Sequence, residues 1–273
     1  MRTASHPMQG SRIQLWLAVA AASCLLLQSA SATVLFSEAF NYTSGTSLSG
    51  KINPGNSTAW STAGATLSIT NADLTYGSLA DLGGNALSIT NGAATSSINT
   101  FANQTSGQIY YSFLLDVITP DSGNNYFTAM NPGTTAPNGG TDAIDCYLYS
   151  NGNIGLRTAG KSTVTTGPLT AGTTYFVVEE YDFSASTAYL YLNPTPGGSM
   201  PAANLSLSGS TATAIDNVGF KAAAGGVTGA YVVDNLRIGT TWADVTPVIP
   251  EPSTVVLLGV GLGLVAAVIR RRR

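Results

Sequence analysis

The stretch that decides the fold is Thr174–Leu192, which runs TYFVVEEYDFSASTAYLYL. On both sides of its central Ser-Ala-Ser triplet, residues alternate at a period of two, as they do in half-buried strands. Its β-branched and aromatic content is typical of strands, and the triplet is typical of a turn. The stretch therefore predicts a β-hairpin with strands Thr174–Phe183 and Thr187–Leu192.

The same period recurs along most of the chain before Pro250, between turns rich in Gly, Asn, Pro and Ser. No convincing amphipathic helix appears there. Many short strands at such spacing favour a single all-β domain, a two-sheet sandwich over residues 33–246. The other predicted strands are Val34–Phe40, Ala65–Thr70, Ala86–Thr90, Gln108–Thr119, Tyr126–Met130, Ala143–Tyr149, Ile215–Phe220 and Ala230–Ile238.

Residues 1–32 have the pattern of a signal peptide. Arg2 and Arg12 make the start positively charged, and Leu15–Leu27 is an apolar run. The small residues Ala30 and Ala32 supply the small-x-small pattern that signal peptidase cuts. We therefore expect an exported mature chain that begins after Ala32.

The end of the chain has three parts: the triplet Pro250-Glu251-Pro252, an uncharged stretch over residues 253–269, and the basic run Arg270, Arg271, Arg272 and Arg273. As an α-helix, the apolar stretch would measure about 25 Å, the short end of what spans a hydrocarbon core. The arginines after it favour the cytoplasmic side, which places the preceding residues outside. We therefore expect a C-terminal transmembrane helix.

This ending resembles the PEP-CTERM sorting signal of Gram-negative bacteria, which an exosortase recognises and cuts. The resemblance implies a precursor held in the inner membrane, which is processed and then delivered to the cell surface or extracellular matrix. Residues 247–252 are then a linker that contains the motif, 253–269 the transmembrane helix and 270–273 a basic cytoplasmic tail. An ordinary tail anchor is the alternative.

Three further segments resemble a concanavalin A-like, LamG-like domain that many PEP-CTERM proteins carry. They are Leu35–Leu48 at the start, Tyr175–Thr195 at the predicted hairpin and Val232–Trp242 near the end. The resemblance implies that the sandwich is a jelly roll, whereas periodicity alone indicates only two packed sheets.

The predicted domain is acidic. Residues 33–246 contain thirteen Asp or Glu against five Lys or Arg, a net charge of −8. An acidic domain without a basic patch is a poor partner for nucleic acid. We expect no nucleic-acid binding.

Histidine and cysteine usage limits the chemistry. The single histidine, His6, lies in the predicted signal peptide, so Ser-His-Asp and Cys-His mechanisms and His-ligated metals are excluded from the mature domain. Cys146 is the one cysteine left after cleavage, so it has no disulfide partner in its own mature chain, and we expect it to be a buried small residue.

Carboxylate chemistry stays open. Glu180 and Asp182 are two residues apart on a predicted strand, so their side chains share a face, and Glu179 points away. A carboxyl pair is what a glycosidase uses. The alternative interpretation is two solvated residues beside a turn, and on it we expect a protein that is not an enzyme.

Two other candidate sites follow from residue pairs. Tyr147 with Tyr149, and Tyr189 with Tyr191, each place two rings on one strand face, where they could stack on sugars or pack on neighbouring strands. Jelly rolls pair their terminal strands, which would bring Glu38 near Asp234 as oxygen ligands for a structural calcium ion. We expect no other cofactor.

The sequence thus predicts an exported β-sandwich of a surface or extracellular polysaccharide matrix, non-catalytic and with a capacity to bind glycans. The alternative is an extracellular carbohydrate-active enzyme, a glycosidase or lyase, that uses Glu180 and Asp182. Its processing partners would be signal peptidase and an exosortase.

Overall fold

The computed structural model describes residues 34–61, 64, 66–249 and 270. The predicted signal peptide and the apolar stretch at 253–269 lie outside these residues. Within the described part of the chain, no helix is both long enough and apolar enough to cross a membrane.

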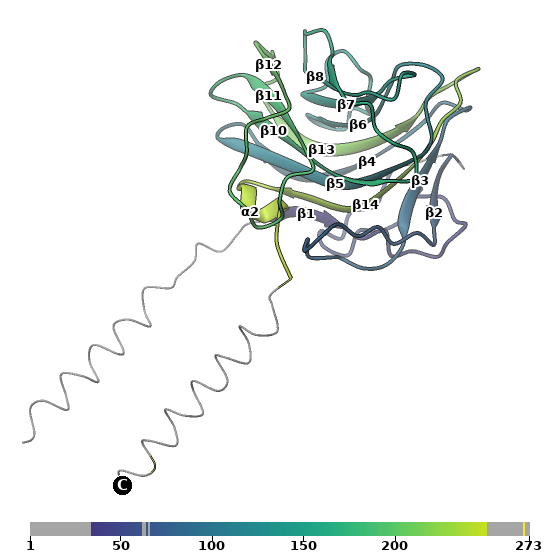
Figure 1. Cartoon of the computed structure of the whole chain (residues 1–273), viewed down its shortest axis with the longest axis horizontal. Helices are drawn as coiled ribbons and strands as arrows, with labels where there is room; N and C mark the ends of the chain where they lie inside the picture. The colour runs from purple at the N-terminus through teal and green to yellow at the C-terminus, as the bar shows by residue number, and fades with distance from the viewer. Residues whose placement is uncertain (1–33, 62–63, 65, 250–269, 271–273) are drawn as a thin grey trace, which may run out of the picture. The chain divides into compact units, whose positions relative to one another are not determined.

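The domain consists of two antiparallel sheets, as the alternation of residues predicts (Figure 1). The eight-stranded sheet contains, in spatial order, β12 (Leu205–Ser208), β11 (Thr187–Leu192), β10 (Thr174–Asp182), β5 (Gln108–Thr119), β14 (Ala230–Gly239), β3 (Ala86–Thr90) and β2 (Leu67–Thr70), with β1 (Val34–Glu38) also paired to β14. The six-stranded sheet contains β4 (Thr95–Gln104), β13 (Ile215–Ala222), β6 (Asn125–Asn131), β7 (Ile144–Leu148), β8 (Ile154–Arg157) and β9 (Val164–Thr166).

The main core lies between the sheets and is rich in aromatic side chains. Phe113 on β5, Phe127 on β6 and Phe220 on β13 are all buried there. Burial of such large rings is the dominant stabilising contribution to a sandwich of this kind. Because side chains alternate along a strand, the residues next to these core residues point to the outer faces of the two sheets.

A second, smaller core covers the outer face of the eight-stranded sheet. Leu114 on β5 and Val178 on β10 point away from the main core and pack with Val245 of the short helix α2 (Trp242–Val245). In Figure 1, α2 lies beside β5 and β14. Its first turn is closed by a capping box in which Thr241 and Asp244 bond each other's backbone. This outer face is thus largely covered.

The all-β sandwich is confirmed, and all ten predicted strands are present. Four more strands, β4, β8, β9 and β12, were not predicted. They are polar, as β4 is (TSSINTFANQ), or only three or four residues long. Strand pairing with a neighbour, rather than their own pattern, holds them in place.

The domain also extends past its predicted end at residue 246. Ala80 N donates to Pro247 O at 2.8 Å, Leu79 forms a β-bridge with Val248, and Ile249 N donates to Ser78 O at 3.1 Å. Residues 247–249, expected in a linker, are therefore bonded to the sandwich.

Candidate active site

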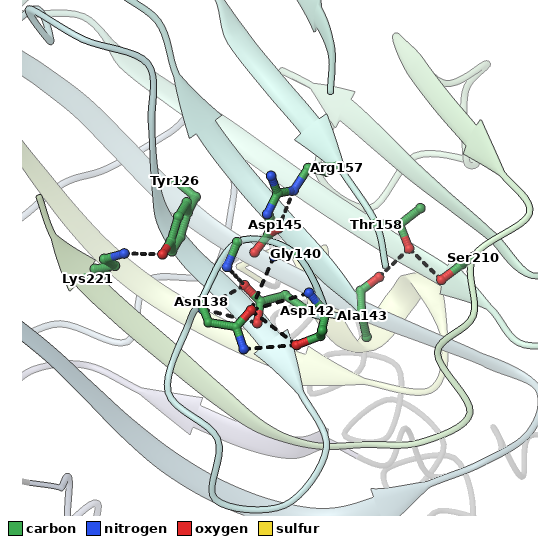
Figure 2. A network of polar contacts seen from close by, with 12 residues as sticks. Tyr126, Asn138, Gly140, Asp142, Ala143, Asp145, Arg157, Thr158, Ser210 and Lys221 are labelled. Atoms are coloured by element: carbon green, nitrogen blue, oxygen red, sulfur yellow. Dashed lines mark hydrogen bonds and ion pairs between the residues drawn. The ribbon is translucent and has the colours of Figure 1, made fainter. Parts of the chain in front are cut away.

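The outer face of the six-stranded sheet gathers charged and aromatic side chains. On β7, Ile144 and Cys146 point into the core, so Asp145 and Tyr147 point outward. Cross-strand pairing places Arg157 of β8 opposite Asp145, and Tyr126 of β6 opposite Tyr147. The group that we call the outer-face cluster consists of Tyr126, Asp142, Asp145, Tyr147, Arg157 and Lys221, most of which Figure 2 shows.

Asp145 is the centre of this cluster. Its carboxyl group is fully buried, and Oδ2 accepts a hydrogen bond from Arg157 Nε at 3.1 Å. Burial raises the pKa of Asp145 well above its ordinary range, and the neighbouring Asp142 carboxylate adds to the rise, which Arg157 opposes. Within the described residues, Asp145 Oδ1 and Arg157 Nη2 are buried and have no hydrogen-bond partner. One atom on each side of this ion pair thus lacks the partner that burial demands.

A covering loop, residues 132–141, lies over the cluster. Asp142 Oδ2 accepts hydrogen bonds from Asn138 N at 3.0 Å and Gly139 N at 2.6 Å. Gly139 has a φ of 70°, and a Cβ at this position would collide with the Tyr126 ring and with Arg157 Nη2. Only glycine allows the loop to approach the cluster so closely.

Three tyrosine rings and a lysine complete the face. The ring centroids of Tyr126 and Tyr147 are 5.5 Å apart, and those of Tyr147 and Tyr149 are 6.1 Å apart. The Arg157 guanidinium lies 5.1 Å from the centre of the Tyr147 ring. Lys221 Nζ donates to the Tyr126 hydroxyl, and burial lowers the pKa of this lysine. The predicted pair Tyr147 and Tyr149 therefore belongs to the outer-face cluster or borders it.

Glu180 and Asp182 do share a face, on the other sheet. Glu180 is buried, accepts a hydrogen bond from the Tyr191 hydroxyl at 2.6 Å, and has its pKa raised by burial. Asp182 Oδ1 instead accepts bonds from the Ser184 hydroxyl at 2.7 Å and from Ala185 N at 3.0 Å. These bonds lower the pKa of Asp182, the hydroxyl of Ser184 most of all. Asp182 thus holds the hairpin turn.

The second tyrosine pair lies at the smaller core. Tyr191 is buried under Trp242, with ring centroids 5.0 Å apart, and belongs to the smaller core. Tyr189 is half-buried and lies opposite Glu180 in the register of β10 and β11. The structure does not bring this pair together with Tyr147 and Tyr149, because the two pairs lie on outer faces of different sheets.

The two predicted calcium ligands, Glu38 and Asp234, accept hydrogen bonds from different sets of neighbouring residues. The carboxylate of Glu38 accepts hydrogen bonds from Phe40 N, the Tyr42 hydroxyl, Asn53 Nδ2 and Trp60 Nε1, at 2.8 to 2.9 Å. Asp234 accepts from Leu74 N and Asn235 N, at 2.9 and 2.6 Å. Across the residues that the structure describes, no group of three or more His, Cys, Asp or Glu is arranged to hold a metal.

The sequence did not single out Asp145, Arg157 or Lys221. Asp145 and Arg157 are twelve residues apart, and Lys221 lies on a strand two positions from β7 in the sheet, so strand order and register bring them together. The one available signal was an aspartate within the otherwise apolar run Ala143–Tyr149. Charged residues in the strands of a sandwich are most often on the outward face, although Glu179 of β10 is an exception.

Comparisons with known proteins concern the C-terminal motif and the fold of the domain. The family model of the PEP-CTERM protein-sorting motif matches residues 248–273, which confirms the sorting signal. No curated protein matches the chain.

Among solved structures, the catalytic domain of the glycoside hydrolase family 131 protein from Coprinopsis cinerea is similar at a TM-score of 0.50 and 14% identity, over 78% of this chain and 97% of that one. A sialidase is similar at a TM-score of 0.49 and 14% identity, and this chain covers 19% of its length. A Trypanosoma rangeli sialidase in complex with 2,3-difluorosialic acid has a TM-score of 0.43 and 13% identity, over 71% of this chain and 34% of that one.

The prediction that this protein is not an enzyme is wrong. Its sandwich has the fold of a glycoside hydrolase catalytic domain along nearly that domain's full length. The lack of histidine excludes only histidine-dependent mechanisms, and this fold accommodates a glycosidase active site. The PEP-CTERM motif in turn implies export, surface sorting and exosortase processing.

Proposed function

We propose that the protein is an exported carbohydrate-active enzyme, a glycosidase of the surface or extracellular polysaccharide matrix of a Gram-negative bacterium. The outer-face cluster is its active site. The observation that carries this proposal is the buried Asp145 carboxyl group, whose Oδ1 has no partner among the described residues and lies in a cluster that also contains an unpartnered Arg157 Nη2. The jelly-roll connectivity of the sandwich is part of the same proposal.

Asp145 and Asp142 supply the two carboxyl groups that glycoside cleavage requires. Burial raises the pKa of Asp145, which suits this carboxyl group to donate a proton to the glycosidic oxygen as the bond breaks. Asp142 is a second carboxyl group, close enough to raise the pKa of Asp145, and its Oδ1 accepts a bond from Asn138 N at 3.3 Å. That oxygen would activate the attacking water or attack the anomeric carbon itself.

The surrounding side chains suit a sugar. Tyr149 is half-buried at the border of the cluster and packs on the buried Tyr147, and sugar rings stack on such aromatic rings. Because the covering loop packs on Tyr126 and Arg157, it would have to move to admit a glycan. Asp142 both holds this loop and takes part in the proposed chemistry, so loop position and catalysis would be coupled.

The test compares four variants of the full-length protein, with release of reducing ends from a polysaccharide panel as the assay. Asp145→Asn and Asp142→Asn should abolish cleavage, whereas Glu180→Gln and Asp182→Asn should retain it. Cleavage that survives Asp145→Asn refutes the site. Loss of cleavage only in Glu180→Gln and Asp182→Asn would move the active site to the eight-stranded sheet.

That second location is favoured by one observation. Burial raises the pKa of Glu180 and turn hydrogen bonds lower the pKa of Asp182, so one strand face carries two carboxyl groups of divergent acidity. Two hydrogen bonds speak against this location. Asp182 accepts one from Ala185 N within the hairpin turn, and Glu180 accepts one from the Tyr191 hydroxyl.

The remaining expectations have direct tests. Intact-mass analysis of the protein from cells and from the medium will show whether both ends of the chain are removed. If residues 253–273 are retained, the C-terminal segment is better explained as a tail anchor. The structural calcium ion expected between Glu38 and Asp234 stays a prediction, tested by the melting temperature with and without EGTA.

A further inference from the structure

The outer-face cluster is unusual within this domain because it gathers charges of both signs, Asp142 and Asp145 with Arg157 and Lys221. Residues 33–246 carry a net charge of −8 and only five basic side chains. Two of these, Arg157 on β8 and Lys221 on β13, belong to the cluster. Burial lowers the pKa of Lys221, the Asp142 and Asp145 carboxylates oppose this, and Arg157 adds a smaller lowering effect. Asp142 and Asp145 balance these two cations, so an anion from outside would be bound through the donors that the two carboxyl groups leave free.

The cations approach the site from opposite sides. Strands β13 and β8 are separated by β6 and β7, so their backbones lie roughly 14 Å apart at the usual strand spacing. Lys221 reaches inward to the Tyr126 hydroxyl, and Arg157 reaches inward to Asp145 (Figure 2). The carboxyl group of Asp145 and the ring of Tyr126 therefore lie between them.

Neither cation uses its full set of donors within the described residues. Arg157 donates through Nε, and its Nη2 is buried without an acceptor. Lys221 bonds to the neutral Tyr126 hydroxyl. Arg237 is an instructive contrast, because its two terminal nitrogens donate to Asn235 Oδ1 and Ala80 O and so serve the fold alone. Arg157 and Lys221 have donors left for a ligand.

We propose that the outer-face cluster binds the carboxylate of a uronic acid residue in an acidic polysaccharide, through Arg157 Nη2 and Lys221 Nζ. This inference rests on the proposed function, because it names the substrate of that active site. A carboxylate matches the planar donor fork of arginine. A neutral sugar offers hydroxyl and ether oxygens as acceptors but no charge, so its hydrogen bonds to Arg157 and Lys221 would be weaker than those of a carboxylate.

Binding of soluble polysaccharides to the full-length protein tests this, by affinity electrophoresis at low and high salt. The probes are polygalacturonate, a neutral β-glucan and dextran sulfate. Polygalacturonate should bind best, and Lys221→Gln and Arg157→Gln should each weaken its binding about tenfold. Lys161→Gln, which removes a positive charge elsewhere, is the matched control and should bind as the wild type does.

Two outcomes would overturn the inference. Equal binding of the glucan and polygalacturonate is one, and a Lys221→Gln loss no larger than that of Lys161→Gln is the other. Preference for dextran sulfate would replace the carboxylate by a sulfate ester and also refute it. Since Arg157→Gln leaves Asp145 without its ion pair, Lys221→Gln decides alone where that variant does not fold.

Failure of this inference and failure of the proposed function are distinguishable. A protein that binds polygalacturonate through Lys221 yet releases no reducing ends from any polysaccharide is a binding protein, and only the catalytic proposal falls. A protein that cleaves neutral glucan and ignores polyuronates is an enzyme, and only the uronate proposal falls.

Discussion

Glu179 gives the sharpest test of the structure, because it is a carboxyl group inside the main core. It lies on β10 between Val178 and Glu180, which point outward, so its side chain points toward the six-stranded sheet. It is fully buried, and neither of its oxygens has a hydrogen-bond partner among the described residues. Burial raises the pKa of Glu179 from its ordinary 4.5 to about 8, against a smaller opposite effect of the Cys146 thiol.

We predict that Glu179 makes the protein less stable as the pH rises. Between pH 4.5 and about 8 the folded protein keeps a proton on this group that the unfolded chain releases. Stability that depends on the proton is therefore complete below pH 4.5 and is lost as the pH approaches the folded-state pKa of about 8. The two pKa values differ by about 3.5, which at about 1.4 kcal/mol per unit amounts to at most about 5 kcal/mol.

Urea unfolding followed by tryptophan fluorescence, repeated across this pH range, measures the effect. Glu179→Gln should remove it, so the variant should be about as stable as the wild type at pH 4.5 and more stable by several kcal/mol near pH 8. Asp234, whose pKa is also raised, to about 7, is present in both proteins and cancels in the comparison. A difference between the two proteins that does not change with pH would refute the assignment of a buried, protonated Glu179.

Three further predictions concern single contacts. Asp182→Ala should lower the free energy of unfolding by about 1–2 kcal/mol, because the donors of Ser184 and Ala185 lose their acceptor, and an unchanged urea midpoint would contradict this. Tyr191→Phe should lower the free energy of unfolding by about 1–3 kcal/mol, because it removes the hydroxyl that donates to Glu180. Tyr189→Phe is the control and should change the free energy of unfolding little. Equal effects of the two substitutions would count against the Tyr191–Glu180 hydrogen bond. Gly139→Ala should be less stable than Gly133→Ala by at least about 1 kcal/mol in thermal unfolding. Both glycines have a φ near 70°, but of the two only Gly139 is in contact with Tyr126. An equal loss of stability in the two variants would show that the loop does not cover the cluster.

Much of the fold was predictable from local alternation, and the site was not. The hairpin Thr174–Leu192 became β10 and β11, and the opposite directions of Glu179 and Glu180 followed from the period of two. That period states which residues share a face, but it does not state which face is covered. The core between the sheets encloses Glu179, and α2 with its neighbours covers Glu180.

The outer-face cluster needed knowledge of strand order. Asp145 and Arg157 face each other because β7 and β8 pair, and Lys221 joins them only because β13 lies beside β6. Charges far apart in the chain meet through these pairings, for which no local pattern exists. The mistaken prediction of a non-enzymatic protein has the same origin, since it weighed only a carboxyl pair adjacent in sequence.

The bonded segment at residues 247–249 has a consequence for release of the domain. The sorting motif begins at residue 248, while Ile249 N still donates to Ser78 O. A cut after Pro250 would leave these contacts intact, so the sandwich would lose nothing on being freed. Three residues, at most about 10 Å of extended chain, separate Ile249 from the apolar stretch. If that stretch spans the membrane as predicted, the uncut domain stands almost against the lipid surface, where long polysaccharides reach it from few directions, and one cut gives them access from all sides.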